Sequence, residues 1–190
     1  MVTFPDKKSL EVWLTRNGID ISAWGTGNSK TLTDLWHELI RGEIILHEYP
    51  PLRVVNVVQV IIRRNDCILV ETEQILRNGR KRQRNQPPAE KFKPGETYHE
   101  AALRCLQEEL GIDHRLIDLQ IETHRQIKNY CHSFSYPGLP SLYTVHIVEA
   151  DVQELPIADF WRDNQSFVSG DAVKKHRWGW RREEARLAEV

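Results

Sequence analysis

One stretch near the middle of the chain, residues 88–112, constrains the fold more than any other segment. A loop that contains proline and glycine ends at Gly95, and an amphipathic pattern then predicts a helix from about Thr97 to Leu110. Gly111 follows this helix directly, as is typical of a helix C-terminus. The expected core face of the helix consists of His99, Ala102, Leu103, Leu106 and Leu110.

The other side of this helix carries charged residues and one cysteine. Cys105, Glu108 and Glu109 have the i, i+3 and i+4 spacing that brings side chains together, and we expect them on a solvent-facing edge. Two adjacent carboxylates on such an edge can hold Mg²⁺ or Mn²⁺, because these cations prefer oxygen ligands. The sequence therefore predicts a metal site at Glu108 and Glu109.

The same stretch resembles the Nudix box, the signature of the Nudix hydrolase family. The family pattern is G-x5-E-x7-R-E-U-x-E-E-x-G-U, where U is an apolar residue. The matching positions are Glu96, Arg104, Leu106, Glu108, Glu109, Gly111 and Ile112. Two positions depart from it, because Glu90 stands where the pattern begins with glycine and Cys105 stands where it has the glutamate after the arginine. An ordinary amphipathic helix with an acidic face is the alternative interpretation.

The resemblance implies an α/β fold, namely an α/β/α sandwich around a mixed sheet with the box as a loop-helix-loop on one side. Apolar, strand-like runs at residues 54–62 and 143–150 fit this arrangement. The order of strand, strand, helix, strand and strand along the chain also fits it. By these strands, the likeness extends over about residues 52–160.

The chain is expected to have two parts. Residues 1–50 show helical periodicity, and we predict a small N-terminal helical extension there. Pro50 and Pro51 mark the change to strand-like periodicity, so residues 51–190 are predicted to form the Nudix-like domain.

The resemblance also implies a chemistry. Nudix enzymes typically hydrolyse a diphosphate linkage in a nucleoside diphosphate derivative, with Mg²⁺ or Mn²⁺ as cofactor. Carried over to this chain, Glu108 and Glu109 are expected as catalytic metal ligands and Arg104 as the catalytic residue that orients neighbouring carboxylates. Glu96 is expected on the substrate side, paired with Arg104. Without a ligand, Glu96 would favour the helix dipole and Arg104 would pair along the helix.

Cys105 is the main difficulty for this interpretation. A thiol is neutral near pH 7 unless its pKa is depressed, and a thiolate prefers softer metals than Mg²⁺. A site with two carboxylates in place of three should bind Mg²⁺ more weakly. Glu122 or Glu149 on a neighbouring strand is the expected source of a substitute carboxylate. A nucleophilic role for Cys105 is disfavoured, because no histidine is placed beside it by sequence.

A basic segment lies just upstream of the box. Five of the eight residues at 77–84 are arginine or lysine. Arginine binds phosphate through two parallel hydrogen bonds, so Arg80, Arg82 and Arg84 are predicted to bind substrate phosphates. A solvated hairpin loop is the alternative, and it is the usual role of a charge run.

Composition narrows the class of protein further. The net charge of −1 implies no general attraction to nucleic acid or to a membrane surface. The three cysteines lack CxxC spacing, which argues against a disulfide framework or a zinc site and favours a reducing compartment. No apolar run is long enough to span a bilayer. We therefore expect a cytoplasmic protein without a membrane partner.

Two functions remain open at this point. The first is a divalent-metal-dependent hydrolase that acts on a nucleoside diphosphate derivative or on an RNA 5′ end. The second is a catalytically weak or inactive Nudix-like module that binds a nucleotide or RNA, or regulates another protein. The expected partner is a nucleotide-type small molecule, while an RNA partner and a homodimer stay open. His132 is the most accessible candidate for a general base.

Overall fold

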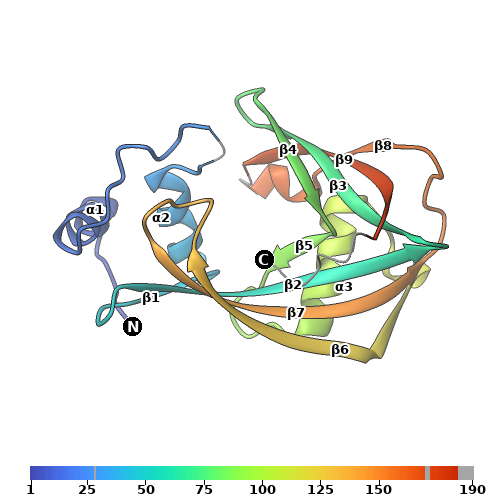
Figure 1. Ribbon diagram of the computed structural model, residues 1–190, viewed down its shortest axis with the longest axis horizontal. Helices are drawn as coiled ribbons and strands as arrows, with labels where there is room; N and C mark the ends of the chain where they lie inside the picture. The colour runs from blue at the N-terminus through green and yellow to red at the C-terminus, as the bar shows by residue number, and fades with distance from the viewer. Residues whose placement is uncertain (28, 170–171, 184–190) are drawn as a thin grey trace. The chain divides into compact units, whose positions relative to one another are not determined.

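The structure is a computed structural model and describes residues 1–27, 29–169 and 172–183 (Figure 1). Its helices are α1 (Lys7–Arg16), α2 (Leu32–Ile40) and α3 (Tyr98–Leu110), with 3-10 helices η1 (His114–Leu116) and η2 (Gln165–Ser169). Its strands are β1 (Ile45–His47), β2 (Leu52–Arg64), β3 (Cys67–Leu76), β4 (Lys81–Gln86), β5 (Ala89–Lys91), β6 (Ile117–His132), β7 (Pro140–Val152), β8 (Phe160–Asp163) and β9 (Val173–Arg182). The predicted α/β fold class with N-terminal helices is confirmed.

The strands of the described residues form a nine-stranded sheet. The main path has the order β6-β7-β2-β3-β9-β8, while β1 and β5 pair with β2 and β4 pairs with β3. The β2–β3, β3–β4, β3–β9 and β8–β9 pairs are antiparallel. Among the described residues, no helix is long and apolar enough to cross a membrane.

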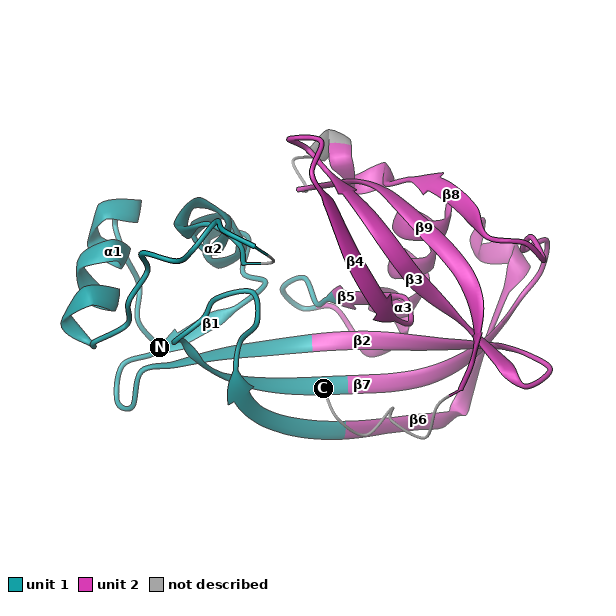
Figure 2. Ribbon diagram, turned by 45° about the horizontal axis from the view of Figure 1, so that its top comes forward, with its two compact units in different colours: residues 1–56, 91–95, 127–145 teal, residues 57–90, 96–126, 146–190 magenta. Residues whose placement is uncertain are grey.

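The chain divides into two compact units, shown in different colours in Figure 2. Unit 1 contains residues 1–56, 91–95 and 127–145, and unit 2 contains residues 57–90, 96–126 and 146–190. Strands β2, β6 and β7 contribute residues to both units. The predicted domain boundary between residues 50 and 51 stays a prediction, and residues 184–190 at the end of the predicted domain lie outside the described part.

Helices α1 and α2 of unit 1 begin at side-chain caps. Asp6 accepts a hydrogen bond from the backbone N–H of Ser9 at the start of α1. Thr31 and Asp34 form a capping box at the start of α2, in which each side chain bonds the backbone of the other residue. The two helices contact each other, and Leu35 is fully buried. Ile40, which belongs to the apolar pattern, is exposed.

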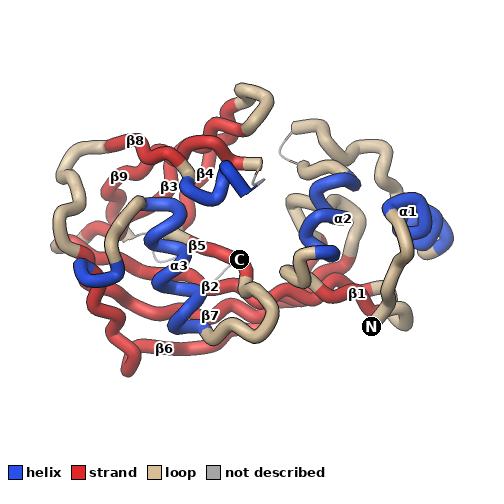
Figure 3. Tube along the Cα trace, turned by 180° about the vertical axis from the view of Figure 1, so that it is seen from behind, coloured by secondary structure: helices blue, strands red, loops and turns tan. Residues whose placement is uncertain are grey.

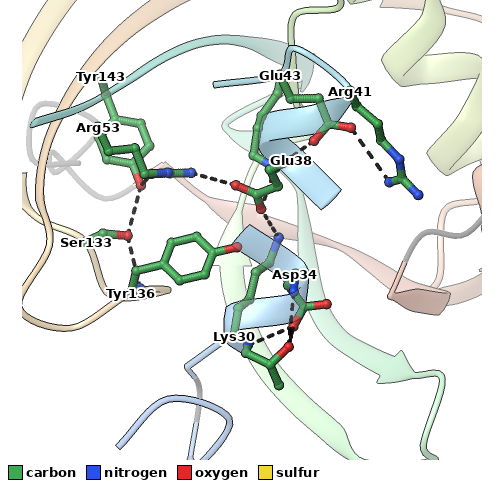
Figure 4. A network of polar contacts seen from close by, with 11 residues as sticks. Lys30, Asp34, Glu38, Arg41, Glu43, Arg53, Ser133, Tyr136 and Tyr143 are labelled. Carbon is green, nitrogen blue, oxygen red and sulfur yellow. Dashed lines mark hydrogen bonds and ion pairs between the residues drawn. The ribbon is translucent and has the colours of Figure 1, made fainter. Parts of the chain in front are cut away.

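A buried ion cluster that was not predicted from the sequence lies in unit 1 (Figure 4). The carboxylate of Glu38 on α2 accepts from Lys30 at 2.8 Å and from Arg53 at 3.0 Å, and it pairs with Lys91 at 2.8 Å. Arg53 also donates to the Tyr143 hydroxyl at 2.8 Å. Both Glu38 and Arg53 are buried, so the pairing offsets the cost of removing two charges from water.

Helix α3 of unit 2 agrees with its predicted range. Thr97 and Glu100 form a capping box at its start, and Gly111 ends it in the left-handed conformation with φ of 67°. The helix contacts η2 and β8, which belong to the same unit (Figure 3). Arg162 of β8 donates to the carbonyl oxygen of Leu110 at 3.0 Å, at the last residue of the helix.

The predicted burial of α3 is partly wrong. His99 is exposed, whereas Cys105 is fully buried and Glu109 is 9% exposed. The expected solvent-facing edge is therefore inside the protein at these two positions. The reason is that several elements contact α3, so its buried face is wider than the single apolar stripe that periodicity detects.

The basic segment is also not the loop that we expected from its charge. Only residues 77–80 connect two strands, and β4 then pairs antiparallel with β3. Arg82, Arg84 and Gln86 alternate with exposed residues and are half-buried. Alternation with period two is the signature of a strand with one covered face. On β4 the residues of both faces are polar, so the alternation in burial could not be seen as an alternation of polar and apolar residues.

Candidate active site on helix α3

Arg104 connects the start of α3 to its last turn. Its Nε and Nη2 atoms donate to the two oxygens of Glu96 at 2.7 and 2.9 Å. Its Nη1 atom donates to Glu108, four residues further on, at 3.1 Å. The expected Glu96–Arg104 pair is therefore present, and its bidentate geometry fixes the plane of the guanidinium.

The charge of Arg104 is held by its neighbours. Burial works against the charged guanidinium, but the Glu96 hydrogen bonds and the charges of Glu90, Glu108 and Glu96 raise the pKa of Arg104 above its ordinary value. Arg104 therefore carries a full positive charge among these carboxylates.

Cys105 faces the interior beside the same carboxylates. Burial raises the pKa of its thiol well above the ordinary value, and the charges of Glu109 and Glu90 raise it further. The thiol is therefore neutral near pH 7 and is neither a nucleophile nor a ligand for a hard cation.

The two departures from the family pattern meet in this region. Glu90 lies on β5, and its charge acts on both Arg104 and Cys105. The chain thus lacks a carboxylate at position 105 and has one nearby at position 90. Both departures from the family pattern are visible in the sequence. The sequence does not show that positions 90 and 105 lie close together in the fold.

The substitute carboxylates that we expected lie in other environments. Glu149 forms an ion pair with Arg63 at 3.1 Å, and its backbone N–H donates to the Thr123 hydroxyl oxygen at 2.9 Å. Glu122 is exposed on β6. Whether Glu122 or Glu149 replaces the missing carboxylate stays a prediction, and Glu90 is a further candidate because its charge acts on the Cys105 thiol.

The donor chemistry of these residues fits a hard divalent cation. Glu90, Glu108 and Glu109 offer carboxylate oxygens, which are the preferred ligands of Mg²⁺ and Mn²⁺. Within the described residues, however, no three His, Cys, Asp or Glu side chains are already arranged as a metal site. The roles of Glu108 and Glu109 as ligands therefore stay predictions.

Comparison with known proteins decides the family. A family model described as NUDIX domain matches residues 52–184. The chain belongs to the Nudix family. It therefore carries the domain of a family of pyrophosphohydrolases.

Solved structures with weak similarity to the chain include two hydrolases and one further protein. The structure of a C. elegans Ap4A hydrolase in a binary complex has 14% identity, covers 66% of this chain and 77% of that chain, and has a TM-score of 0.36. The structure of the E. coli ORF135 protein has 20% identity, covers 67% of this chain and 72% of that chain, and has a TM-score of 0.35. The structure of a NUDIX family hydrolase from Clostridium perfringens has 15% identity, covers 67% of this chain and 80% of that chain, and has a TM-score of 0.37. No curated protein sequence matches the chain significantly.

The predicted phosphate-binding arginines of this Nudix domain do not form one exposed group. Arg80 is exposed in the turn before β4, whereas Arg82 and Arg84 lie on the half-buried face of that strand. Arg84 donates to Glu71 at 3.3 Å and to Gln86 at 2.6 Å. Whether any of the three arginines binds substrate stays a prediction.

Sequence reasoning missed a buried polar cluster on the sheet of the Nudix domain. Its members are Glu71, Gln74, Arg84, Gln86, His176 and Trp178. The available signal was the change from apolar residues to Glu-Thr-Glu-Gln in the second half of β3. Such a change is typical of a strand that leaves the core, whereas here Glu71 and Gln74 stay buried.

Proposed function

We propose that this Nudix domain hydrolyses a diphosphate linkage in a nucleoside diphosphate derivative, with Mg²⁺ or Mn²⁺ held by Glu108 and Glu109. The observation that supports the proposal is the Arg104 ion pair with Glu96 and Glu108, beside the nearly buried Glu109. When bound, the cation neutralises the diphosphate and lowers the pKa of the attacking water. An RNA 5′ end with a diphosphate linkage would meet the same chemical requirement.

Arg104 acts in this proposal as a positioning residue. Its three hydrogen bonds hold Glu96 and Glu108 in fixed orientations, so the carboxylate of Glu108 needs little reorganisation when a cation binds. The guanidinium also offsets the repulsion between the carboxylates around it. Glu109 is held by the helix backbone one residue further along, in a site where low exposure strengthens its attraction to a cation.

Glu90 supplies the carboxylate that position 105 lacks. A fully buried, neutral thiol at Cys105 leaves room for a negative charge from another element, and Glu90 brings that charge from β5. The departure at position 90 thus compensates the departure at position 105, and the domain retains a third acidic group.

A binding module is the second candidate function. It is favoured by one observation, the full burial of Cys105 at a position where the family pattern has a carboxylate. In this case the domain binds a nucleotide without efficient turnover.

The deciding experiment is turnover of a panel of nucleoside diphosphate derivatives and capped or triphosphorylated RNA, with Mg²⁺ and with Mn²⁺. We expect turnover by the wild type and a loss of about 10²- to 10³-fold in Glu109→Gln, because removing one electrostatic group from an active site has an effect of this size. Glu11→Gln is the matched control, since Glu11 is an exposed glutamate on helix α1. A folded wild type that binds a nucleotide but turns over no substrate with either metal would identify a binding module.

A further inference from the structure

Polar side chains occupy a buried face of strands β3, β4 and β9 in unit 2. Glu71 on β3 lies opposite Gln86 of β4 and opposite Trp178 of β9. Gln74 lies opposite Arg82 on one side and His176 on the other. The three strands are neighbours in the sheet (Figure 2). These residues therefore form two adjacent rows across it.

A β-bulge brings the two rows onto one face. The register of β3 shifts between Glu71 and Glu73 against both of its neighbours. Such a shift re-aims the side chains that follow it. As a result, the side-chain amide of Gln74 donates to Glu71 at 2.8 Å, although an odd spacing would place the two side chains on opposite faces of a regular strand.

The cluster is almost entirely removed from solvent. Glu71 and Gln74 are each 5% exposed, His176 is 2% exposed and Trp178 is 0% exposed. A core position normally holds an apolar side chain, because a buried polar group costs free energy unless it is hydrogen-bonded. Four polar side chains on one covered face are therefore a feature that packing alone does not explain.

Glu71 orients its neighbours through its carboxylate. It accepts from Gln74, from Nε of Arg84 at 3.3 Å, and from Nδ1 of His176. In the neutral tautomer of His176 that donates from Nδ1 to Glu71, Nε2 is left as a hydrogen-bond acceptor. The amide of Gln74 points its NH₂ group to Glu71, which leaves Oε1 as a second acceptor.

Three buried polar atoms of the cluster have no hydrogen-bond partner among the described residues. They are Nε2 of His176, Oε1 of Gln74 and Nε1 of Trp178. In the tautomer given above the first two accept a hydrogen bond, and the third donates one. An unpaired buried polar group costs free energy, so three of them in one cluster point to a missing partner.

Two rings of the cluster are stacked, and one of its charged members reaches solvent. The rings of His176 and Trp178 have centroids 5.8 Å apart and an angle of 27° between their planes. Arg84 is the more exposed member of its ion pair with Glu71, with 29% of its side chain exposed. Solvent therefore reaches the cluster at Arg84.

We propose that the polar face of Gln74, His176 and Trp178 binds the heterocyclic base of the nucleotide and selects an edge with two N–H donors and one acceptor. The inference rests on the proposed function in taking the ligand to be a nucleotide. Among the common bases, guanine has this edge, with N1–H, the N2 amino group and O6. Adenine has an amino donor where guanine has O6 and a ring-nitrogen acceptor where guanine has N1–H, so its edge opposes the protein at both positions.

The same face is joined to the end of α3. Arg162 of β8 lies opposite His176 of β9 in the strand register. Its Nε atom donates to the carbonyl oxygen of Leu110, the residue that follows Glu109. A base bound at the polar face thus lies in the same unit as the carboxylates that the proposed function assigns to the diphosphate.

The test is the affinity of the full chain for GDP, ADP and IDP, measured by calorimetry. IDP lacks the N2 amino group of GDP and separates the contribution of the second donor. We expect GDP to bind at least about 10-fold more tightly than ADP, with IDP between them, because a mismatched edge leaves a buried group unpaired. Equal affinity for the three nucleotides would overturn the inference and assign the cluster to the protein core.

Two variants test the assignment to these residues. Gln74→Met keeps the volume but removes the acceptor, and Trp178→Phe removes only the indole N–H and keeps an aromatic ring. Each should reduce the GDP-to-ADP affinity ratio toward one, whereas Gln83→Met, at an exposed glutamine on β4, should leave it unchanged. Thermal unfolding checks that each variant is folded. If one variant is unfolded, the affinity ratio of the other variant decides the test. A ratio that survives in both folded variants would overturn the inference.

The outcome is separable from that of the proposed function. Turnover without any base preference would contradict base recognition by the polar face and would still support the proposed hydrolase. If the protein shows no turnover but prefers GDP through Gln74 and Trp178, the base-recognition inference is supported. The protein is then a nucleotide-binding module and the proposed hydrolase is contradicted.

Discussion

The guanidinium of Arg104 donates to both carboxylate oxygens of Glu96, which precedes it by eight residues and lies just before the first turn of α3. This contact joins the loop before the helix to the middle of the helix. The Nη1 bond from Arg104 to Glu108 extends the connection into the last turn. The candidate active site is therefore organised by one side chain before any ligand is present.

Replacement of Arg104 by lysine should separate charge from geometry. Lysine keeps the positive charge but cannot form the bidentate pair with Glu96. We expect Arg104→Lys to remain folded, to lose about 1–3 kcal/mol of unfolding free energy, and to lower any turnover more than it weakens nucleotide binding. Denaturant unfolding and steady-state kinetics measure both effects. Arg125→Lys, at an exposed position on β6, is the control, and equal effects in the two variants would contradict a positioning role for Arg104.

The departures at positions 90 and 105 should be energetically coupled. Cys105→Glu alone places a carboxylate in a fully buried position near Glu90 and Glu109, so we expect a loss of about 3–5 kcal/mol of stability. This expectation replaces the simpler one, in which a new glutamate at an exposed edge would only strengthen Mg²⁺ binding. Glu90→Gly combined with Cys105→Glu restores the family pattern and should recover part of the loss.

A double-mutant cycle with the wild type, both single variants and the combined variant measures this coupling. We expect a coupling free energy of about 1–3 kcal/mol, since residues that interact directly give values in this range. Titration of each protein with Mn²⁺ gives a second reading, in which the combined variant should bind more tightly than Cys105→Glu. Additive effects of the two substitutions on stability would show that Glu90 and Cys105 do not interact.

The buried ion cluster of unit 1 should make the stability of the protein sensitive to acid. Although burial opposes its charge, Lys30, Lys91 and Arg53 lower the pKa of Glu38 well below its ordinary value of 4.5. A carboxylate with a depressed pKa in the folded state stabilises the protein above the unfolded value. That contribution is lost as the pH falls from about 4.5 through the lower folded-state pKa.

Glu38→Gln tests this contribution. The variant leaves the cations around position 38 without their shared carboxylate, so we expect a loss of about 3–5 kcal/mol at pH 7. It should also lose less further stability than the wild type when the pH falls below 4.5. Denaturant unfolding at several pH values measures the difference. Glu48→Gln, an exposed change in the same unit, should follow the wild type, and a similar acid response in Glu38→Gln would assign the acid sensitivity to other groups.

Two arginines of the basic segment, Arg84 and Arg80, should behave differently. Arg84 is half-buried and donates to Glu71, so Arg84→Ala leaves a buried carboxylate with one donor fewer and should cost about 1–3 kcal/mol of stability. Arg80 is exposed in a turn, so Arg80→Ala should change stability by less than about 0.5 kcal/mol. Thermal unfolding of both variants checks this. Equal and small effects would mean that the segment is solvated throughout, as its charge alone suggested.

Local signals were sufficient to predict α3 and its ends. The Thr97 capping position, the apolar repeat and Gly111 are all encoded within a few residues of one another. Burial of Cys105 and Glu109 was not predictable in this way, because the elements that contact α3 include β8 and η2, which come much later in the chain. Periodicity identifies one packed face, and a helix contacted by several elements has more than one.

The strand β4 and the polar cluster were missed for a related reason. A polar strand has no apolar alternation, so its pairing with β3 was hidden by the charges of Arg82 and Arg84. Glu71 and His176 are separated by 105 residues, and only the register of β3 against β9 brings them together. Their hydrogen bond is a property of the sheet, and neither residue signals it in its own segment.

The pairing of Glu38 with Arg53 has a practical consequence for any shortened form of this protein. A chain that begins after residue 50 would retain Arg53, Tyr143 and Lys91 but would lose the only carboxylate that Arg53 is shown to bind among the described residues. A buried guanidinium without a counterion is costly, and Arg53 cannot lose its proton to avoid this cost. Removing the N-terminal helices therefore has the same effect as deleting the negative charge that pairs with Arg53 inside the remaining protein. Arg53→Met should stabilise the shortened chain, whereas the same substitution should not stabilise the chain that retains Glu38.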